Sequence, residues 1–329
     1  MDTGRALAHS ILCWFTTLCC IALTACEPVE SLVEFDSWTF EGYQVYSYAP
    51  ESPRGLVYLF HGSGGSAEFA NRLETIDVIN LLIEHHYAFV ATESSQRTDE
   101  RRWQVNDASF DSNPDLARLL RLQGQLESRY AINRQTPLFG IGMSNGARMV
   151  SLFGQAFADA GLPVSAISPV MGTVATPVRQ AGGLTVPALF ILAENETVVS
   201  NTRIMADHAQ VRANQIDSDL LIKAEEPLLD WRFTRIPSID ASEAEAIYHT
   251  ALDSGIWNEE GSRIVSVSEA LEILTMLQLP AGVSGDAAAV ATQMKLILAG
   301  HQFSAFYRQQ LVDFFNKHNP QFALAADDD

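Results

Sequence analysis

Cysteine is scarce in this 329-residue sequence, and its four copies all lie near the beginning of the chain. They are Cys13, Cys19, Cys20 and Cys26, and none follows Cys26. Without thiols, the chain beyond this point cannot form disulfides, use a thiol nucleophile or bind a metal through cysteine. Any chemistry in that part of the chain must come from other side chains.

Positive charge is also scarce. The chain has 21 Lys and Arg residues against 40 Asp and Glu residues, which gives a net charge of −19 and a pI near 4.7. An acidic protein is repelled by phosphate backbones and anionic bilayers, so we expect no nucleic-acid partner and no membrane adhesion by charge. We expect no cofactor and no metal ion. His85 and His86 follow Glu84, but neighbouring helix positions point apart and cannot chelate from one face.

The apolar run near the beginning of the chain is too short to span a membrane. It extends from Ile11 to Leu23 behind Arg5, which is typical of a signal peptide. Its end, Leu23-Thr24-Ala25-Cys26, resembles the lipobox of bacterial lipoproteins. The resemblance implies that residues 1–25 are removed and that lipidated Cys26 anchors the exported protein to a membrane of the bacterial cell envelope. An ordinary signal peptide cut elsewhere is the alternative.

The sequence from Pro137 to Phe153 has the pattern of a buried strand, a tight turn and a helix. The turn, Gly142-Met143-Ser144-Asn145-Gly146, matches the G-x-S-x-G pattern of a nucleophile elbow. Such a turn exposes the serine hydroxyl, and the N–H of Asn145 at the helix N-terminus can stabilise a developing anion. We predict Ser144 as nucleophile, Asn145 as one oxyanion donor and Met143 as a pocket residue. A chance match in an ordinary turn is the alternative.

A second glycine-rich stretch follows the apolar strand Gly55–Phe60. The loop His61-Gly-Ser-Gly-Gly-Ser66 lacks the Lys-Ser/Thr ending of a P-loop, which argues against nucleotide binding. It resembles the oxyanion loop of α/β-hydrolases, in which an N–H just after His-Gly faces the reacting carbonyl oxygen. The resemblance implies Ser63 as the second oxyanion donor, with Gly64 as the other candidate, whereas a plain glycine-rich turn remains the alternative.

Strands and helices alternate along the chain. Apolar patterns predict edge strands over Thr39–Tyr48, a helix over 73–83, strands at Ala88–Thr92, Val164–Val170 and Val186–Leu192, and a helix opened by Asn113-Pro114. This alternation indicates an α/β fold with a mostly parallel, doubly wound sheet. Loops after such strands hold ligand sites, so Trp103 is either a wall of the substrate pocket or a residue packed under the loop.

The segment Tyr130-Ala-Ile-Asn133 and the PLFGIGMSNGARM that follows resemble α/β-hydrolases of the polyhydroxybutyrate depolymerase and feruloyl esterase type. The resemblance implies an α/β-hydrolase fold with helices on both faces of the sheet. Two features depart from that type. Asn133 replaces the usual aspartate, and the cysteine often found in the oxyanion loop is absent.

The acid of the catalytic triad is implied by the same resemblance. Similar hydrolases carry it in an Asp-Pro-Val-Val-like turn, and Glu196 aligns with that aspartate through Val198 and Val199. Its task is to accept the imidazole Nδ1–H and stabilise the imidazolium as it forms. Glu194 is the rival acid, and a solvated surface turn is the further alternative.

We predict that the base is His301. The apolar run Met294–Gly300 is interpreted as the last strand of the sheet, and a histidine directly after it can reach across the carboxyl edge. The alternative is a histidine that serves only in packing.

Four regions follow from these assignments. Residues 1–25 are the lipoprotein signal peptide, 26–200 the hydrolase core, 201–290 a mostly helical insertion before the last strand, and 291–329 the end of the core with an acidic tail. The insertion is too long for a bare loop and is either a lid over the site or peripheral decoration.

The predicted activity is hydrolysis of carboxylic esters through an acyl-enzyme on Ser144, with His301 as base. The substrate is a small or oligomeric ester, and short-chain esters, polyester oligomers, feruloyl sugars and peptides all stay open. The alternatives are an acyltransferase with the same residues and a non-catalytic hydrolase-fold lipoprotein that binds a ligand or partner. The oligomeric state is left open.

Overall fold

The computed structural model describes residues 28–98, 100–130, 132–280, 283 and 287–321. The predicted signal peptide and Cys26 lie outside these residues. Within them, no helix is long and apolar enough to cross a membrane. The chain divides into two compact units, one formed by residues 30–226 with the chain from Lys295 onward, the other by Pro227–Met294.

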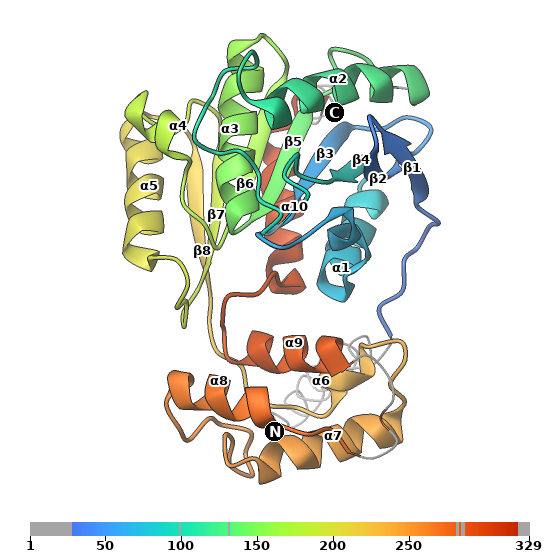
Figure 1. Ribbon diagram of the computed structural model, residues 1–329, viewed down its shortest axis with the longest axis vertical. Helices are drawn as coiled ribbons and strands as arrows, with labels where there is room; N and C mark the ends of the chain where they lie inside the picture. The colour runs from blue at the N-terminus through green and yellow to red at the C-terminus, as the bar shows by residue number, and fades with distance from the viewer. Residues whose placement is uncertain (1–27, 99, 131, 281–282, 284–286, 322–329) are drawn as a thin grey trace, which may run out of the picture. The chain divides into compact units, whose positions relative to one another are not determined.

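An eight-stranded sheet forms the centre of the larger unit (Figure 1). Its spatial order is β1-β2-β4-β3-β5-β6-β7-β8. Strand β2 is antiparallel to both of its neighbours, and every pair from β4–β3 to β7–β8 is parallel. The strands are β1 Asp36–Phe40, β2 Tyr43–Tyr48, β3 Gly55–Phe60, β4 Tyr87–Thr92, β5 Leu138–Met143, β6 Val164–Val170, β7 Ala188–Ala193 and β8 Ser218–Lys223. This order and these directions confirm the predicted α/β-hydrolase fold.

Helices cover both faces of the sheet because its central strands are apolar on both sides. Every residue of β3, β4, β5 and β7 is buried. One core joins the sheet to α2 Pro114–Arg129, α3 Asn145–Asp159, α4 Thr176–Gln180 and α5 Asn201–Ala213; the other joins it to α1 Leu73–Glu84 and α10 Arg308–Lys317. Two short 3₁₀ helices, Ala67–Asn71 and Ala305–Tyr307, complete this unit. Two hydrophobic layers thus hold the sheet edge rigid where the loops after the strands meet.

The smaller unit is helical. It contains α6 Trp231–Thr234, α7 Ala241–Asp253 and α8 Val267–Met276, and most of α9 Ala287–Ile297. The predicted start of the insertion, residue 201, is therefore too early in the chain. Helix α5 packs on the sheet and β8 pairs with β7, so residues 201–226 belong to the core and the helical part starts near Pro227.

The predicted last strand, Met294–Gly300, is wrong. Its first residues end α9, and the chain then turns at Ala299, where φ is 49° and the Gly300 N–H bonds to the Lys295 carbonyl. A short buried apolar run fits a helix end as well as a strand, and periodicity alone does not separate them. The eighth strand, β8, precedes the helical unit; being a partly exposed edge strand with polar ends, it carries a weak pattern.

Candidate active site

Ser144 lies between β5 and α3 in a backbone conformation that non-glycine residues rarely adopt. Its φ is 57° and its ψ is −113°. The Ser144 N–H donates to the Val170 carbonyl at 2.9 Å, which ties the turn to β6. Strain of this kind costs about 1–3 kcal/mol and persists only where the surrounding structure imposes it. The turn therefore has the strand-to-helix geometry of a nucleophile elbow.

Glycines make this turn sterically possible. A Cβ at Gly142 would lie 2.0 Å from the Gly146 carbonyl oxygen, and a Cβ at Gly146 would lie 2.2 Å from the Phe60 carbonyl oxygen. A third glycine, which the sequence analysis missed, is equally confined. A Cβ at Gly172 would lie 2.5 Å from both the Ser144 carbonyl oxygen and the Ala147 Cβ. Its sequence signal is its position two residues after the end of β6.

Glu196 and His301 form a hydrogen-bonded pair. The imidazole Nδ1 lies 2.6 Å from Glu196 Oε2, and the carboxylate side chain is fully buried. The other oxygen, Oε1, accepts the N–H groups of Val198 at 2.6 Å and Val199 at 3.1 Å. Burial favours the neutral acid, but the bond to His301 and the two backbone N–H groups outweigh it, so the pKa of Glu196 is lowered. The carboxylate is thus charged and oriented toward the imidazole.

Asn195 fastens the loop of the acid to the loop of the histidine. Its N–H donates to the Ala299 carbonyl at 3.1 Å, and its Nδ2 donates to the Leu298 carbonyl at 2.9 Å. The rival acid points elsewhere, because Glu194 Oε2 accepts the Glu225 N–H at 3.1 Å. The structure therefore brings together Glu196 and His301, and not Glu194 and His301.

The Ser144 hydroxyl makes no hydrogen bond with His301 within the described chain. Its Oγ lies beyond hydrogen-bonding distance of both ring nitrogens, and Nδ1 is bonded to Glu196 instead. In enzymes without bound substrate, catalytic hydrogen bonds are often long and tighten only when substrate binds. The geometry therefore agrees with the roles predicted for Ser144, Glu196 and His301, with the hydrogen bond between Ser144 and His301 not formed.

The two predicted oxyanion donors come from different elements. The Asn145 N–H belongs to the first turn of α3 and so has no acceptor within the helix. Ser63 lies in the loop after β3, where its neighbour Gly64 donates its N–H to the Glu100 carbonyl at 2.5 Å. Of the two candidates for the second oxyanion donor, Gly64 thus already donates its N–H to a backbone carbonyl. The loop lies beside the elbow, since a Cβ at Gly62 would lie 3.4 Å from the Ser144 Cβ, at van der Waals contact.

Of the two roles expected for Trp103, a wall of the substrate pocket or a residue packed under the loop, the structure shows the second. The residue is only 2 % exposed and belongs to the core above β3. Its backbone N–H donates to Asn145 Oδ1 at 2.7 Å and its indole N–H to the His61 carbonyl at 2.9 Å. Met143 is also buried, with 8 % exposure. An apolar aromatic after a strand suits a pocket or a packed loop, and here burial of the indole in the core prevails.

His61 has no sequence signal beyond its place in the glycine-rich loop, yet its imidazole is buried and hydrogen-bonded through both ring nitrogens. It is 1 % exposed, its Nδ1 lies 2.7 Å from the Gly62 carbonyl oxygen, and its Nε2 accepts the Ser94 N–H at 3.1 Å. These bonds require a neutral ring with the proton on Nδ1. Burial lowers the pKa of His61 to about 4.

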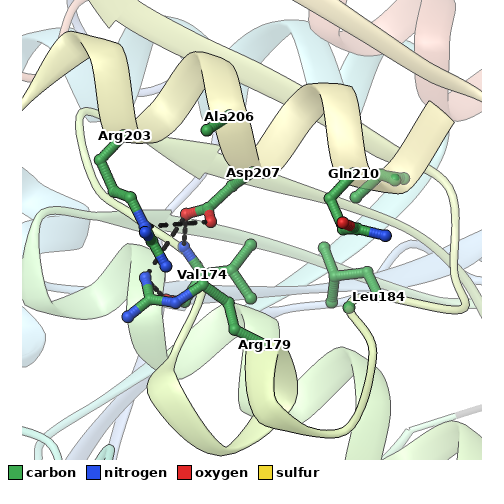
Figure 2. Close-up of a pocket in the computed structure, with 9 residues that line it drawn as sticks. Val174, Arg179, Leu184, Arg203, Ala206, Asp207 and Gln210 are labelled. Atoms are coloured by element: carbon green, nitrogen blue, oxygen red, sulfur yellow. Dashed lines mark hydrogen bonds and ion pairs between the residues drawn. The ribbon is translucent and has the colours of Figure 1, made fainter. Parts of the chain in front are cut away.

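A pocket of about 210 Å³ lies apart from these residues, between α4 and α5 (Figure 2). Buried Asp207 accepts the Val174 N–H at 2.8 Å, and Arg179 and Arg203 each approach it to 3.6 Å. Burial raises the pKa of Asp207, although the Val174 N–H and the two arginines favour the charged form. The carboxylate thus serves to hold the loop after β6 to α5. No cluster of three or more potential metal ligands exists among the described side chains.

No protein-family model and no curated protein matches the chain. Solved structures that resemble it include an arylesterase (14% identity, TM-score 0.45, covering 60% of this chain and 79% of that one). A carboxylesterase from Mesorhizobium loti shows 16% identity and a TM-score of 0.44, covering 58% and 90%. An acetyl xylan esterase from Aspergillus awamori shows 12% identity and a TM-score of 0.44, covering 55% and 79%. The strand order and directions of the chain itself carry the assignment of its fold.

Proposed function

We propose that the protein is a serine hydrolase that cleaves carboxylic esters through an acyl-enzyme on Ser144. The observation that carries the proposal is the strained backbone of Ser144 at the N-terminus of α3. Backbone strain in non-glycine residues clusters at functional sites, and here the strained turn presents a hydroxyl beside the Asn145 N–H, which has no acceptor within α3. The hydrogen bond between His301 and the buried Glu196 carboxylate supports the same activity.

In the proposed reaction, His301 Nε2 removes the proton of Ser144 Oγ while the oxygen attacks the ester carbonyl carbon. Glu196 accepts the Nδ1–H, which fixes the tautomer and stabilises the imidazolium. The backbone N–H groups of Ser63 and Asn145 donate to the carbonyl oxygen as it becomes an anion. His301 then protonates the leaving alkoxide, and water, activated by the same histidine, releases the acid and restores Ser144.

The substrate we propose is a small or oligomeric carboxylic ester of the kind cleaved by polyhydroxybutyrate depolymerases and feruloyl esterases. We also propose export of the protein and lipid anchoring through Cys26 to a membrane of the cell envelope. The lipobox-like sequence before Cys26 supports this location.

The test is labelling with a fluorophosphonate, followed by turnover of a panel of esters of increasing acyl length. We expect Ser144→Ala to abolish both labelling and turnover, because the reagent and the substrate need the same oxygen. Ser151→Ala is the matched control, since Ser151 lies on α3 and its hydroxyl only donates to Arg148 and accepts from Ala175. Undiminished turnover in purified Ser144→Ala would overturn the proposal, and acyl transfer to an added alcohol in preference to water would identify an acyltransferase.

A further inference from the structure

The two oxyanion donors must keep a fixed separation although they lie on segments far apart in the chain. Ser63 follows β3, whereas Asn145 begins α3. Donors that stabilise an oxyanion must already point at its position before the reaction, and functional groups must be held to within about 0.5 Å. A rigid connection between these two segments is therefore part of what the site requires.

Trp103 makes such a connection from a third segment, the loop between β4 and α2. Its backbone N–H donates to the side-chain oxygen of Asn145 at 2.7 Å. Its indole N–H donates to the carbonyl oxygen of His61, two residues before Ser63, at 2.9 Å. One buried residue thus bonds at once to the elbow and to the oxyanion loop.

Packing and further bonds keep this connection rigid. The indole lies edge-on to Phe60 with ring centroids 5.3 Å apart, and its face is tilted over the His61 imidazole at 4.8 Å. The imidazole in turn bonds to the Gly62 carbonyl and to the Ser94 N–H. It also fills the inside of the glycine turn, because a Cβ at Gly65 would lie 2.8 Å from the His61 Cβ.

We propose that Trp103 is a positioning residue, which sets the relative placement of the Ser63 and Asn145 N–H donors through its two hydrogen bonds. The inference rests on the proposed ester hydrolysis. Trp103 does not touch the reacting atoms. It acts through Asn145 and His61, so its removal should weaken stabilisation of the oxyanion more than binding of the ester.

The test is Trp103→Phe, which keeps an aromatic ring and removes the indole donor. Two matched controls undergo the same substitution. Trp38→Phe also loses an indole hydrogen bond, the one to Ser47 Oγ at 2.9 Å on β1–β2. Trp257→Phe replaces an equally buried indole, 2 % exposed, whose nitrogen has no hydrogen-bond partner among the described residues.

The readout is the ratio of kcat for 4-nitrophenyl acetate to kcat for its thionoester analogue, measured beside KM. Sulfur accepts hydrogen bonds more weakly than oxygen, so this ratio reports how well the donors stabilise the developing anion. Damage to the fold as a whole would reduce both rates together. We expect the ratio to fall about tenfold or more in Trp103→Phe, since complete removal of one donor costs about 10²–10³ in kcat. We expect KM to change by less than about twofold.

Asn145→Ala is the second variant, which removes the other bond to Trp103 while keeping the backbone donor. It should lower the same ratio in the same direction. If both variants remain folded by circular dichroism and keep the oxygen-to-sulfur ratio of Trp38→Phe and Trp257→Phe, the positioning role is refuted. Should Trp103→Phe not fold, the ratio in Asn145→Ala decides. Failure of the proposed function would look different, because the wild-type protein itself would then show no Ser144-dependent turnover.

Discussion

His301 Nδ1 lies 2.6 Å from Glu196 Oε2, across 105 positions of sequence. Both residues are held by loops that Asn195 joins through the carbonyls of Leu298 and Ala299. The carboxylate has no exposed surface, and its second oxygen is saturated by two backbone N–H groups. A single orientation is therefore imposed on the acid, and that orientation faces the imidazole.

The first prediction separates the two candidate acids. Glu196→Gln keeps the size of the side chain but removes the charge that stabilises imidazolium, so kcat should fall by up to about 10⁴-fold, by analogy with aspartate-to-asparagine changes in serine proteases. Glu194→Gln is the matched control and should remain near wild type, because the Glu194 carboxylate accepts the Glu225 N–H and not the His301 imidazole. The measurement is turnover of one ester at one pH, with the rate of Ser144 labelling alongside. A crippled Glu194→Gln beside an active Glu196→Gln would reverse the assignment.

A second prediction concerns Gly172. A Cβ there would lie 2.5 Å from the Ser144 carbonyl oxygen, so Gly172→Ala should displace the elbow and destabilise the protein by about 1–3 kcal/mol. Ester turnover should fall with it. Gly124→Ala is the control, because a Cβ at that position of α2 would meet nothing within 4 Å beyond its chain neighbours and the backbone of its own helix.

The control should be neutral or more stable by up to about 1 kcal/mol, since alanine is favoured over glycine in helices. Urea denaturation with turnover assays checks both variants. Equal stability and equal turnover in Gly172→Ala and Gly124→Ala would show that the contact at Gly172 is not needed by the elbow.

The third prediction is a pH dependence that arises from His61. Burial lowers the pKa of this imidazole from 6.5 to about 4 in the folded protein. Between these values the unfolded chain binds the proton and the folded protein does not, so the contribution of His61 to stability is present above pH 6.5 and is lost as pH falls toward 4. One pKa unit corresponds to about 1.4 kcal/mol, which makes this contribution up to about 3 kcal/mol.

Two measurements check it. An NMR titration, with the His61 signal assigned from its loss in His61→Asn, should show a neutral ring down to about pH 4. The free energy of unfolding of wild type should decline more steeply between pH 6.5 and 4.5 than that of His61→Asn. A ring that titrates near pH 6.5 would contradict the tautomer derived from Ser94 and Gly62.

The fourth prediction concerns attachment to the membrane. Cys26→Ser in the full chain should release the protein from the membrane fraction, because the lipid would have no attachment site. The control is Cys20→Ser, which lies within the segment that the lipobox resemblance says is removed. Fractionation followed by immunoblotting checks both. A Cys26→Ser protein that still sediments with membranes means that something other than this cysteine anchors it.

Local pattern was sufficient for much of the fold. Leu138, Phe139 and Ile141, followed by Gly142 and Gly146, predict a buried strand and a tight turn, and the structure has both. Asn113 before Pro114 likewise predicts the start of α2, where the Asn113 side chain caps two N–H groups. These features depend on interactions between near neighbours in sequence, and so can be inferred without knowing the rest of the molecule.

Other features depend on distant contacts. Met294–Gly300 is apolar enough for a strand, but it forms the end of α9 and a turn. Ser218–Lys223 has a weak strand pattern, yet it pairs with β7 as strand β8. Trp103 could have lined a pocket, but it is buried in the core, where it bonds to Asn145 Oδ1 and to the His61 carbonyl. His61 carried no signal beyond its place before Gly62, because its neutral state follows from burial and from Ser94, which lies 33 positions away. Tertiary packing thus decided the places of Trp103 and His61, because buried polar atoms are stable only where they find hydrogen-bond partners. It also decided which apolar segment pairs with the edge of the sheet.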